Sequence, residues 1–192
     1  TLHNTLFPYT TLFRSHHFEL NDTEITRFML YGFDASPSGG DPCHHGVLNR
    51  CVAHTGADPE QNVDGFAFGH GNQYHFVLNQ CTAYDVFDGF DISARNTTLN
   101  GCEAYRCGWG GVKIWQDSVR LKNCIIHHNH VTNIELDWDG TQGTTQLIHC
   151  TIYNGGTWNI NAYDNPSDQL VMYNCIVAGG NNVGILIQET NY

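Results

Sequence analysis

The fold is decided by a repeated sequence motif, seen in VLNQCTAY at residues 77–84 and in TLNGCEAY at residues 98–105. We call this motif the phrase. The phrase recurs four more times, as VLNRCVAH (47–54), RLKNCIIH (120–127), LIHCTIYN (147–154) and VMYNCIVA (171–178). Successive cysteines of the phrase are 30, 21, 22, 26 and 25 residues apart. A period in this range indicates a repeat protein in which each repeat packs on the next.

A second short apolar stretch follows each phrase. These stretches are GFAFG (65–69), GFDIS (89–93), GVKIW (111–115), NIELD (133–137), NINAY (159–163) and GILIQ (184–188). If the repeats stack, two columns of apolar side chains face inward. The first column is Phe66, Phe90, Val112, Ile134, Ile160 and Ile185, and the second is Phe68, Ile92, Ile114, Leu136, Ala162 and Ile187. Two or three short strands in such a period describe one coil of a parallel β-solenoid.

The competing solenoid is a leucine-rich repeat, but its leucine spacing is missing. The minimal coil and the Asn-Cys turn resemble right-handed parallel β-helices of the pectate-lyase type. We therefore predict an all-β chain that forms a right-handed parallel β-helix of about six coils, each of 21–30 residues.

The N-terminal residues do not follow the repeat. Residues 5–15, TLFPYTTLFRS, resemble the translation of a common sequencing adapter. We therefore treat residues 1–15 as a non-native leader, and residues 16–192 as a single β-helix domain that is a fragment of a longer protein. No apolar run in the sequence approaches the length that a membrane span needs.

The chain is acidic, with 19 Asp and Glu against 8 Lys and Arg and a net charge of −11. Such a chain binds nucleic acid poorly, and it is either indifferent to anionic ligands or dependent on a cation to hold them. We expect a secreted monomer with no nucleic-acid or membrane partner.

Six of the eight cysteines occupy one position of the coil. This pattern favours an interior ladder of small apolar thiols. A metal site is disfavoured because no CxxC pair occurs, and disulfides are disfavoured because stacked Cβ atoms point in parallel. Cys43 and Cys107 lie off the ladder.

Carboxylates interrupt the repeat on one face. The outward positions of the second stretch read Ala67, Asp91, Lys113, Glu135, Asn161 and Leu186, and the turn positions before it read Asp64, Asp88, Gly110, Thr132, Trp158 and Val183. Side chains on adjacent coils lie about 5 Å apart, so the three aspartates would repel one another. Ca²⁺, which prefers carboxylate oxygens, would remove the conflict. Asp-Gly is also ordinary turn chemistry, which explains Asp64 and Asp88 but not the mid-strand Asp91.

The run NVDGFAFGHG, followed by DVFDGFDIS and GWGGVKIW, resembles the active-site coils of polysaccharide lyase family 9, which are pectate lyases with a β-helix fold. The resemblance covers residues 47–115. It implies that Asp64, Asp88 and Asp91 bind Ca²⁺ and that Lys113 is the catalytic base. The family's doubled aspartate is Phe87-Asp88 in this chain, and Asp85 on the same turn is a candidate for the missing ligand.

The implied reaction is β-elimination on an acidic polysaccharide, with pectate or polygalacturonate as the expected substrate. A lysine must lose its proton before it acts as a base, so we expect an alkaline optimum. Arg95 and Arg106 are candidates for pairing a substrate carboxylate. Among Trp109, Trp115 and Trp138, Trp115 has the register best suited to stacking on a sugar.

Four alternatives stay open. A β-helix that binds carbohydrate without cleaving it, or a purely structural one, has no use for Lys113 as a base. A lyase or epimerase for another uronate, such as alginate, shares the proton abstraction. Glu135 and Asp137 could suggest a glycoside hydrolase, but they lie side by side on one strand rather than across a cleft. The run HHNH (127–130) is interpreted as a turn.

Overall fold

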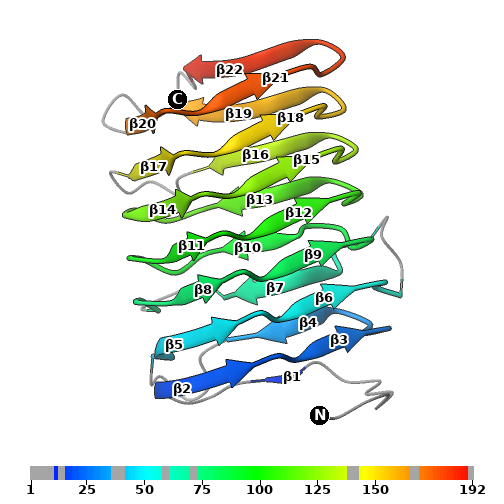
Figure 1. Cartoon of the computed structure of the whole chain (residues 1–192), viewed down its shortest axis with the longest axis vertical. Helices are drawn as coiled ribbons and strands as arrows, with labels where there is room; N and C mark the ends of the chain where they lie inside the picture. Colours follow the sequence, from blue (N-terminus) through cyan, green and yellow to red (C-terminus); the bar gives the residue numbers. More distant parts are fainter. Residues whose placement is uncertain are drawn as a thin grey trace.

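The computed structural model describes residues 11–12, 16–35, 42–57, 61–69, 73–137, 143–164 and 169–189. In these ranges the chain winds into a parallel β-helix, in which every coil contributes one strand to each of three parallel sheets (Figure 1). None of the described residues form a helix long and apolar enough to cross a membrane.

The three sheets are called A, B and C. Sheet A consists of β1 (Thr11–Leu12), β4 (Tyr31–Asp34), β7 (Asp64–Phe68), β10 (Phe90–Ile92), β13 (Gly110–Ile114), β16 (Thr132–Asp137), β19 (Trp158–Asp164) and β22 (Val183–Glu189). Sheet B consists of β2 (His16–Asn21), β5 (His44–Asn49), β8 (Val77–Asn79), β11 (Thr98–Asn100), β14 (Val119–Lys122), β17 (Thr144–Ile148) and β20 (Gln169–Tyr173). Sheet C consists of β3 (Glu24–Thr26), β6 (Val52–His54), β9 (Thr82–Tyr84), β12 (Glu103–Tyr105), β15 (Ile125–His127), β18 (Thr151–Tyr153) and β21 (Ile176–Ala178).

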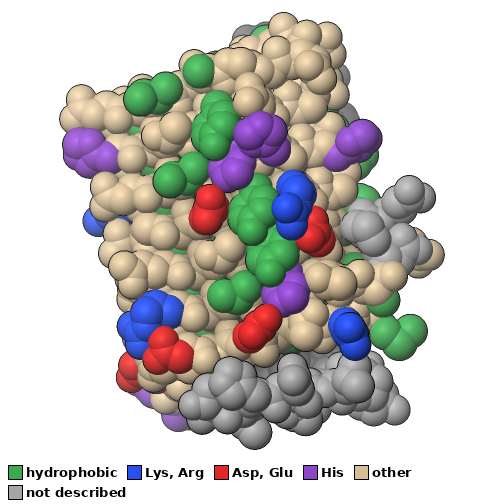
Figure 2. Space-filling view, turned by 45° about the vertical axis from the view of Figure 1, so that its right-hand side comes forward, with side chains coloured by type: hydrophobic (Ala, Val, Ile, Leu, Met, Phe, Trp, Pro, Cys, Tyr) green, Lys and Arg blue, Asp and Glu red, His purple; other side chains and the backbone are tan. Residues whose placement is uncertain are grey.

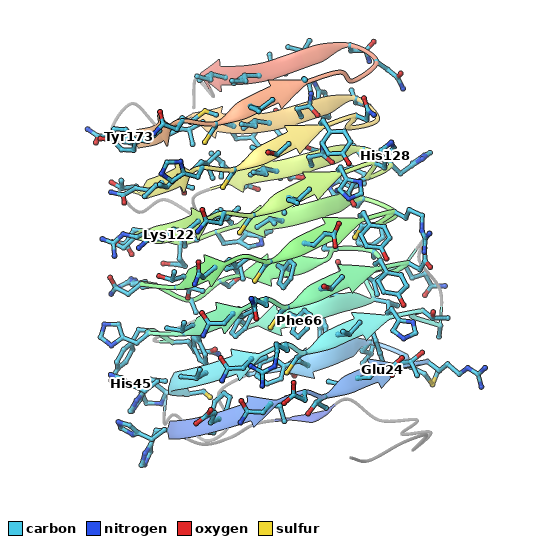
Figure 3. The ribbon with its side chains drawn as sticks, viewed as in Figure 1. Glu24, His45, Phe66, Lys122, His128 and Tyr173 are labelled. Atoms are coloured by element: carbon cyan, nitrogen blue, oxygen red, sulfur yellow. The ribbon has the colours of Figure 1, made fainter. Side chains whose placement is uncertain are left out.

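The predicted inward columns are confirmed by the strand register. Phe66, Phe90 and Val112 pair in sequence, and so do Phe68, Ile92 and Ile114. Phe66 and Phe90 are fully buried, with rings stacked 5.0 Å apart, and Figure 3 shows Phe66 inside the coil. Stacking therefore buries what a single coil would leave exposed.

The repeat begins one coil earlier than the cysteines indicate. Strands β2, β3 and β4 form this coil, in which Asn21 pairs with Asn49 and the next strand begins at Glu24 opposite Val52. Thr23 takes the place that cysteine has in later coils, and its hydroxyl donates to the carbonyl of Asn21. The missing cysteine hid this coil from the sequence reading. At the same end, Thr11–Leu12 of the leader pairs with β4.

The cysteine ladder is confirmed, and all eight cysteines are free thiols. Each thiol of the ladder donates to a leucine carbonyl one coil earlier, over 3.3–3.6 Å. Asparagines beside the ladder also link the coils, since Asn79 donates to Asn49 over 2.8 Å and Asn49 donates to Asn21 over 2.8 Å. Polar groups at this corner thus satisfy one another along the helix axis.

The corners between sheets use left-handed backbone. At the corner between sheets B and C, Arg50, Gln80, Gly101 and Asn123 have φ between 52° and 65°. Other residues with positive φ occupy the other two corners of most coils. A single residue in this conformation turns the chain sharply without a long loop, which keeps the coil short.

Rings stack on the outer face of sheet C. His54, Tyr84, Tyr105, His127 and Tyr153 form this ring stack, with centroids 4.7–5.3 Å apart and planes within 10° of parallel. In Figure 2 hydrophobic and histidine side chains form a stripe up this face, flanked by charged groups.

Candidate active site

Sheet A brings the predicted catalytic side chains together. The register pairs Asp91 of β10 with Lys113 of β13, and Lys113 with Glu135 of β16. On the other side Asp91 pairs with Ala67 of β7, so the predicted outward column is present. Asp91 and Lys113 are half-buried, whereas Glu135 is only 6% exposed.

Asp64 begins β7, and Asp88 lies two residues before β10 on the next coil. The amide of Gly65 donates to the carbonyl of Asp88 over 2.9 Å, which fixes the two aspartates side by side. Asp64 is fully buried and Asp88 is 1% exposed. The Asp88 Oδ1 accepts from the amide of Gly110 over 2.9 Å, but the Asp88 Oδ2 and both carboxylate oxygens of Asp64 are buried without a hydrogen bond.

Their electrostatics follow from this burial. Burial raises the pKa of Asp64 to about 7, and the charge of Asp91 adds to the rise. The pKa of Asp88 also lies well above its usual range, through burial first and then through Asp64 and Asp91. The charge of Lys113 opposes both shifts. Three carboxylates and one amine therefore share one electrostatic environment.

Two further residues of this environment come from the coil that the sequence reading missed. Tyr31 pairs with Asp64, and Asp34 pairs with Ala67, so Asp34 and Asp91 flank Ala67 in the same column. Asp34 is 7% exposed. Burial raises the pKa of the Tyr31 phenol, and Asp64, Asp34 and Asp91 raise it further. The motif YGFD (31–34) was the available signal.

The donor set matches a hard divalent cation in type. Carboxylate oxygens are the preferred ligands of Ca²⁺, and three buried oxygens of Asp64 and Asp88 have no hydrogen-bond partner. In the described part of the chain, however, no three His, Cys, Asp or Glu side chains already stand in metal-holding geometry. Binding would therefore require the carboxylates to turn toward the ion.

Lys113 is positioned by an aromatic neighbour. Its Nζ lies 4.5 Å from the centre of the ring of Trp115, the residue that follows the end of β13. Arg95 lies at the corner after β10, where its Nε donates to Gln116 over 3.2 Å and approaches Asp117 at 3.6 Å. Arg95 and Trp115 thus remain candidates for binding substrate at this end of the strands. Trp138 lies outside the described residues.

Asp85 and Arg106 lie at the opposite corner, between sheets C and A. The Arg106 Nε and Nη2 donate to the two Asp85 oxygens over 2.9 and 2.8 Å. The guanidinium carbon of Arg106 lies 4.9 Å from the Tyr105 ring centre and 5.4 Å from that of Tyr84. Each group therefore already has a partner of opposite charge.

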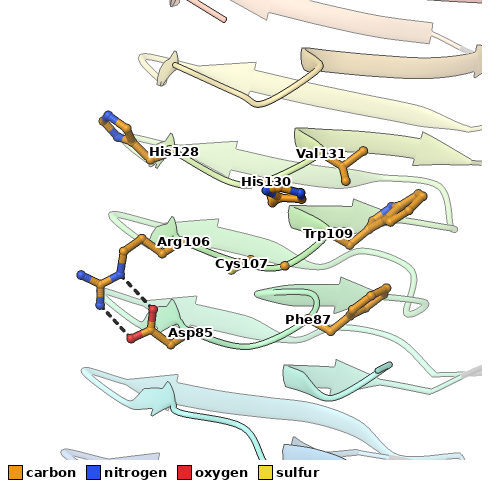
Figure 4. Close-up of a pocket in the computed structure, with 9 residues that line it drawn as sticks. Asp85, Phe87, Arg106, Cys107, Trp109, His128, His130 and Val131 are labelled. Carbon is orange, nitrogen blue, oxygen red and sulfur yellow. Dashed lines mark hydrogen bonds and ion pairs between the residues drawn. The ribbon is translucent and has the colours of Figure 1, made fainter. Parts of the chain in front are cut away.

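A groove of about 950 Å³ runs along this corner. Its lining is Asp85, Phe87, Arg106, Cys107, Gly108, Trp109, His128, His130 and Val131. Figure 4 shows three coils contributing to it. Figure 3 places His128 at this corner, opposite the corner that carries His45. Reading HHNH as a turn gave no hint of the groove.

Comparison with known proteins places the fold. The sequence pattern of the family described as a right-handed β-helix region matches residues 60–192. A search of curated protein sequences finds no match.

Solved structures are similar at low identity. The A-module of the Azotobacter vinelandii mannuronan C-5 epimerase AlgE4 aligns at 15% identity over 92% of this chain and 56% of its own, with a TM-score of 0.64. Pectate lyase Pel9A aligns at 11% over 90% and 55%, with a TM-score of 0.63. A mutant of the periplasmic alginate epimerase AlgG aligns at 13% over 89% and 48%, with a TM-score of 0.58. The chain spans about half the length of these structures.

Proposed function

The chain belongs to the right-handed β-helix family, and on that basis we propose that it is a calcium-dependent polysaccharide lyase that cleaves a uronate polymer, with pectate or polygalacturonate as the expected substrate. The observation that carries this proposal is the pairing of Asp91 with Lys113 beside the buried carboxylates of Asp64 and Asp88. A purely structural β-helix would gain nothing from unpartnered buried carboxylates, which cost stability.

In the proposed reaction Lys113, as a neutral amine, takes the proton from C5 of a uronate ring. The C5–H electron pair then forms a C4=C5 double bond as the C4–O bond breaks. The departing oxygen takes a proton from solvent, and an unsaturated sugar end remains. The ring of Trp115 holds the amine of Lys113 in place.

Asp64, Asp88 and Asp91 would hold the calcium ion, and Asp85 is kept as a further candidate should its pairing with Arg106 open. When bound, calcium would place positive charge beside the substrate carboxylate, and the proton on the neighbouring C5 would become more acidic. The same ion allows a chain of net charge −11 to hold an anionic polymer. Arg95 is proposed to pair a substrate carboxylate. Since such polymers lie outside cells, we place the protein there.

The experiment is the ultraviolet absorbance of unsaturated products from polygalacturonate at alkaline pH. We expect a rise with calcium, none with a chelator, and a rate lowered by about 10²–10⁴ in Lys113→Ala. Lys122→Ala is the matched control, because Lys122 lies on sheet B. A rise that persists in Lys113→Ala would refute the role of Lys113.

A second candidate function is a uronate C-5 epimerase, and Tyr31 is the observation that favours it. Tyr31 pairs with Asp64 in the register of sheet A, and burial together with the charge of Asp64 raises the pKa of its phenol, so the phenol keeps its proton. A protonated phenol could return a proton to C5 on the face opposite to abstraction. Deuterium incorporation at C5 in D₂O without unsaturated products would identify the epimerase, and its loss in Tyr31→Phe would assign the donor.

A further inference from the structure

The groove between sheets C and A has one apolar wall. This wall consists of Phe87, three residues before β10, and of Trp109 and Val131, which directly precede β13 and β16 on the next two coils. The rings of Phe87 and Trp109 stack at 6.0 Å with their planes 19° apart. Trp109 is 37% exposed. Figure 4 shows both rings on the same side of the groove. An exposed aromatic wall of this kind binds flat apolar surfaces.

The indole of Trp109 is fixed from behind. Its Nε1 donates to the Glu135 Oε2 over 2.7 Å, and Glu135 is almost fully buried next to Lys113 in the outward column. A hydrogen bond to a buried carboxylate holds the ring in one orientation before any ligand arrives. The hydrogen bond between Trp109 and Glu135 therefore connects the groove to the outward column that contains Lys113.

The opposite wall carries polar groups, and the charged pair and His128 among them are already engaged, while the exposed His130 also lines the groove. Asp85 and Arg106 form a bidentate ion pair, so their charges balance. The His128 Nδ1 lies 2.7 Å from the Nδ1 of His127, and its Nε2 lies 3.2 Å from Asn154. Among the described lining residues, no Lys or Arg other than Arg106 occurs. The groove thus offers an apolar surface with a balanced charge.

This charge balance contrasts with the acidic column beside the groove. A free uronate carboxylate entering the groove would lose water and would meet no Lys or Arg other than Arg106, which is already paired with Asp85, so its entry is unfavourable. The C–H face of a pyranose ring would lose little and would cover the exposed edges of Phe87 and Trp109. We propose that the groove binds a second pyranose ring of the polysaccharide, one that carries no free carboxylate because it is neutral or esterified.

The proposal rests on the proposed function for the identity of the polymer. The expected substrate is a polymer in which free uronates are accompanied by neutral or methyl-esterified sugars. Phe87 contributes to this preference because it gives the wall of the groove a ring and no charge.

The experiment is calorimetric titration with trigalacturonate and its methyl ester, in a chelator so that calcium does not bind the free acid, and in a Lys113→Ala background so that no ligand is consumed. We expect the ester to bind more tightly than the free acid. Trp109→Ala should weaken binding of the ester by about ten-fold or more, and leave that of the acid little changed. Phe87→Ala should act in the same direction, and Tyr173→Ala, which removes an exposed ring from a distant coil, should change neither.

Trp109→Phe guards against misfolding, since it keeps a ring and loses only the hydrogen bond to Glu135. If this variant folds and binds the ester within a few-fold of the parent, the loss in Trp109→Ala is a loss of the ring. Equal affinity for acid and ester, or an ester affinity that survives Trp109→Ala, would overturn the proposal. Because binding needs no turnover, ester binding without lyase activity would instead refute only the proposed function.

Discussion

At the residue scale, the buried carboxylates make stability depend on pH in an unusual direction. In calcium-free protein the pKa of Asp64 is about 7, against an ordinary value of 3.8. The unfolded chain releases this proton near pH 4, while the folded chain holds it up to about pH 7. The contribution of Asp64 therefore favours folding at low pH and is lost as pH rises through this window, by about 4 kcal/mol at most.

We expect Asp64→Asn to be more stable than the parent above pH 7 in a chelator, and the difference to shrink toward pH 4. Denaturant unfolding of both proteins across this range measures it, and the subtraction removes the contribution of the other acids. A difference that does not vary with pH would mean that the Asp64 carboxyl ionises normally.

Calcium should reverse the ranking of these two proteins. An ion that binds the folded state stabilises it in proportion to its concentration over the dissociation constant. We expect calcium to raise the melting temperature of the parent at pH 8, and Asp64→Asn to bind calcium on the order of ten-fold or more weakly. Asp117→Asn, in the turn between β13 and β14, is the control. A calcium response that Asp64→Asn keeps in full would place the ion elsewhere.

Sequence reading reached part of this site. It placed Asp91 beside Lys113, because the period of the repeat fixes which outward residues stack. It missed Tyr31 and Asp34, because their coil has Thr23 in place of the cysteine that marks the repeat. Repeat spacing orders residues along the column, but it says nothing about how deeply their carboxylates are buried.

At the scale of the element, a short coil requires residues with positive φ at its corners, and this conformation is unfavourable for most residues. Gly101 has φ +65°, and a Cβ added there would meet only the Cγ of Gln80 at 3.5 Å, which is ordinary contact. Gln80 holds the same conformation with φ 55°. A side chain therefore fits at position 101, and what distinguishes Gly101 from Gln80 is the preference of glycine for positive φ.

We expect Gly101→Ala to lower the free energy of unfolding by about 1 kcal/mol, and Gln80→Gly to change it little or to raise it. Thermal unfolding of the two variants measures both. A stabilising Gly101→Ala would show that entropy lost by the unfolded chain outweighs backbone strain. The sequence could not reveal these corners, because most of them carry ordinary polar residues rather than glycine.

The strands of sheet A depend on the stacked phenylalanines. Phe66 is fully buried against Phe90, at a ring distance of 5.0 Å. We expect Phe66→Ala to destabilise the protein by about 3–5 kcal/mol, because it removes both the buried ring and its packing partner's contacts. Chemical denaturation measures the loss. Ile125→Ala on the exposed face of β15 is the control, and a similar loss there would argue against an interior role specific to Phe66.

Element positions were the most predictable part of the fold. The alternation of inward and outward residues gave the columns of sheet A correctly, since strand period and coil period agree. The groove at the corner was not predictable, because side chains at corners do not alternate. Trp115 was the preferred sugar-stacking residue on register, whereas Trp109 is the one that lines a groove.

At the scale of the whole molecule, the apolar columns reach the last described coil without cover. Ile185 is 41% exposed and Ile187 is 60% exposed on β22, although both continue columns that are buried elsewhere. An uncovered sheet face and its strand edge favour association with another apolar surface. We therefore expect any self-association of this chain to occur through β22.

We expect Ile187→Lys to reduce self-association of this chain at high concentration with little change in stability, because the side chain is already exposed. Sedimentation velocity over a concentration series measures it. Lys introduced at Tyr173, which is 57% exposed on sheet B, is the control for added charge alone. Self-association that Ile187→Lys leaves unchanged would place the contact away from β22.

The ring stack on sheet C has an optical consequence. Tyr84 and Tyr105 lie face to face at 5.0 Å with planes 10° apart, and imidazoles extend the stack on both sides. Transition dipoles held so close and so nearly parallel share their excitation, so the near-ultraviolet circular dichroism of these tyrosines should carry a paired signal. The signal exists only while neighbouring coils keep their register, which gives the chain a built-in spectroscopic gauge of coil separation.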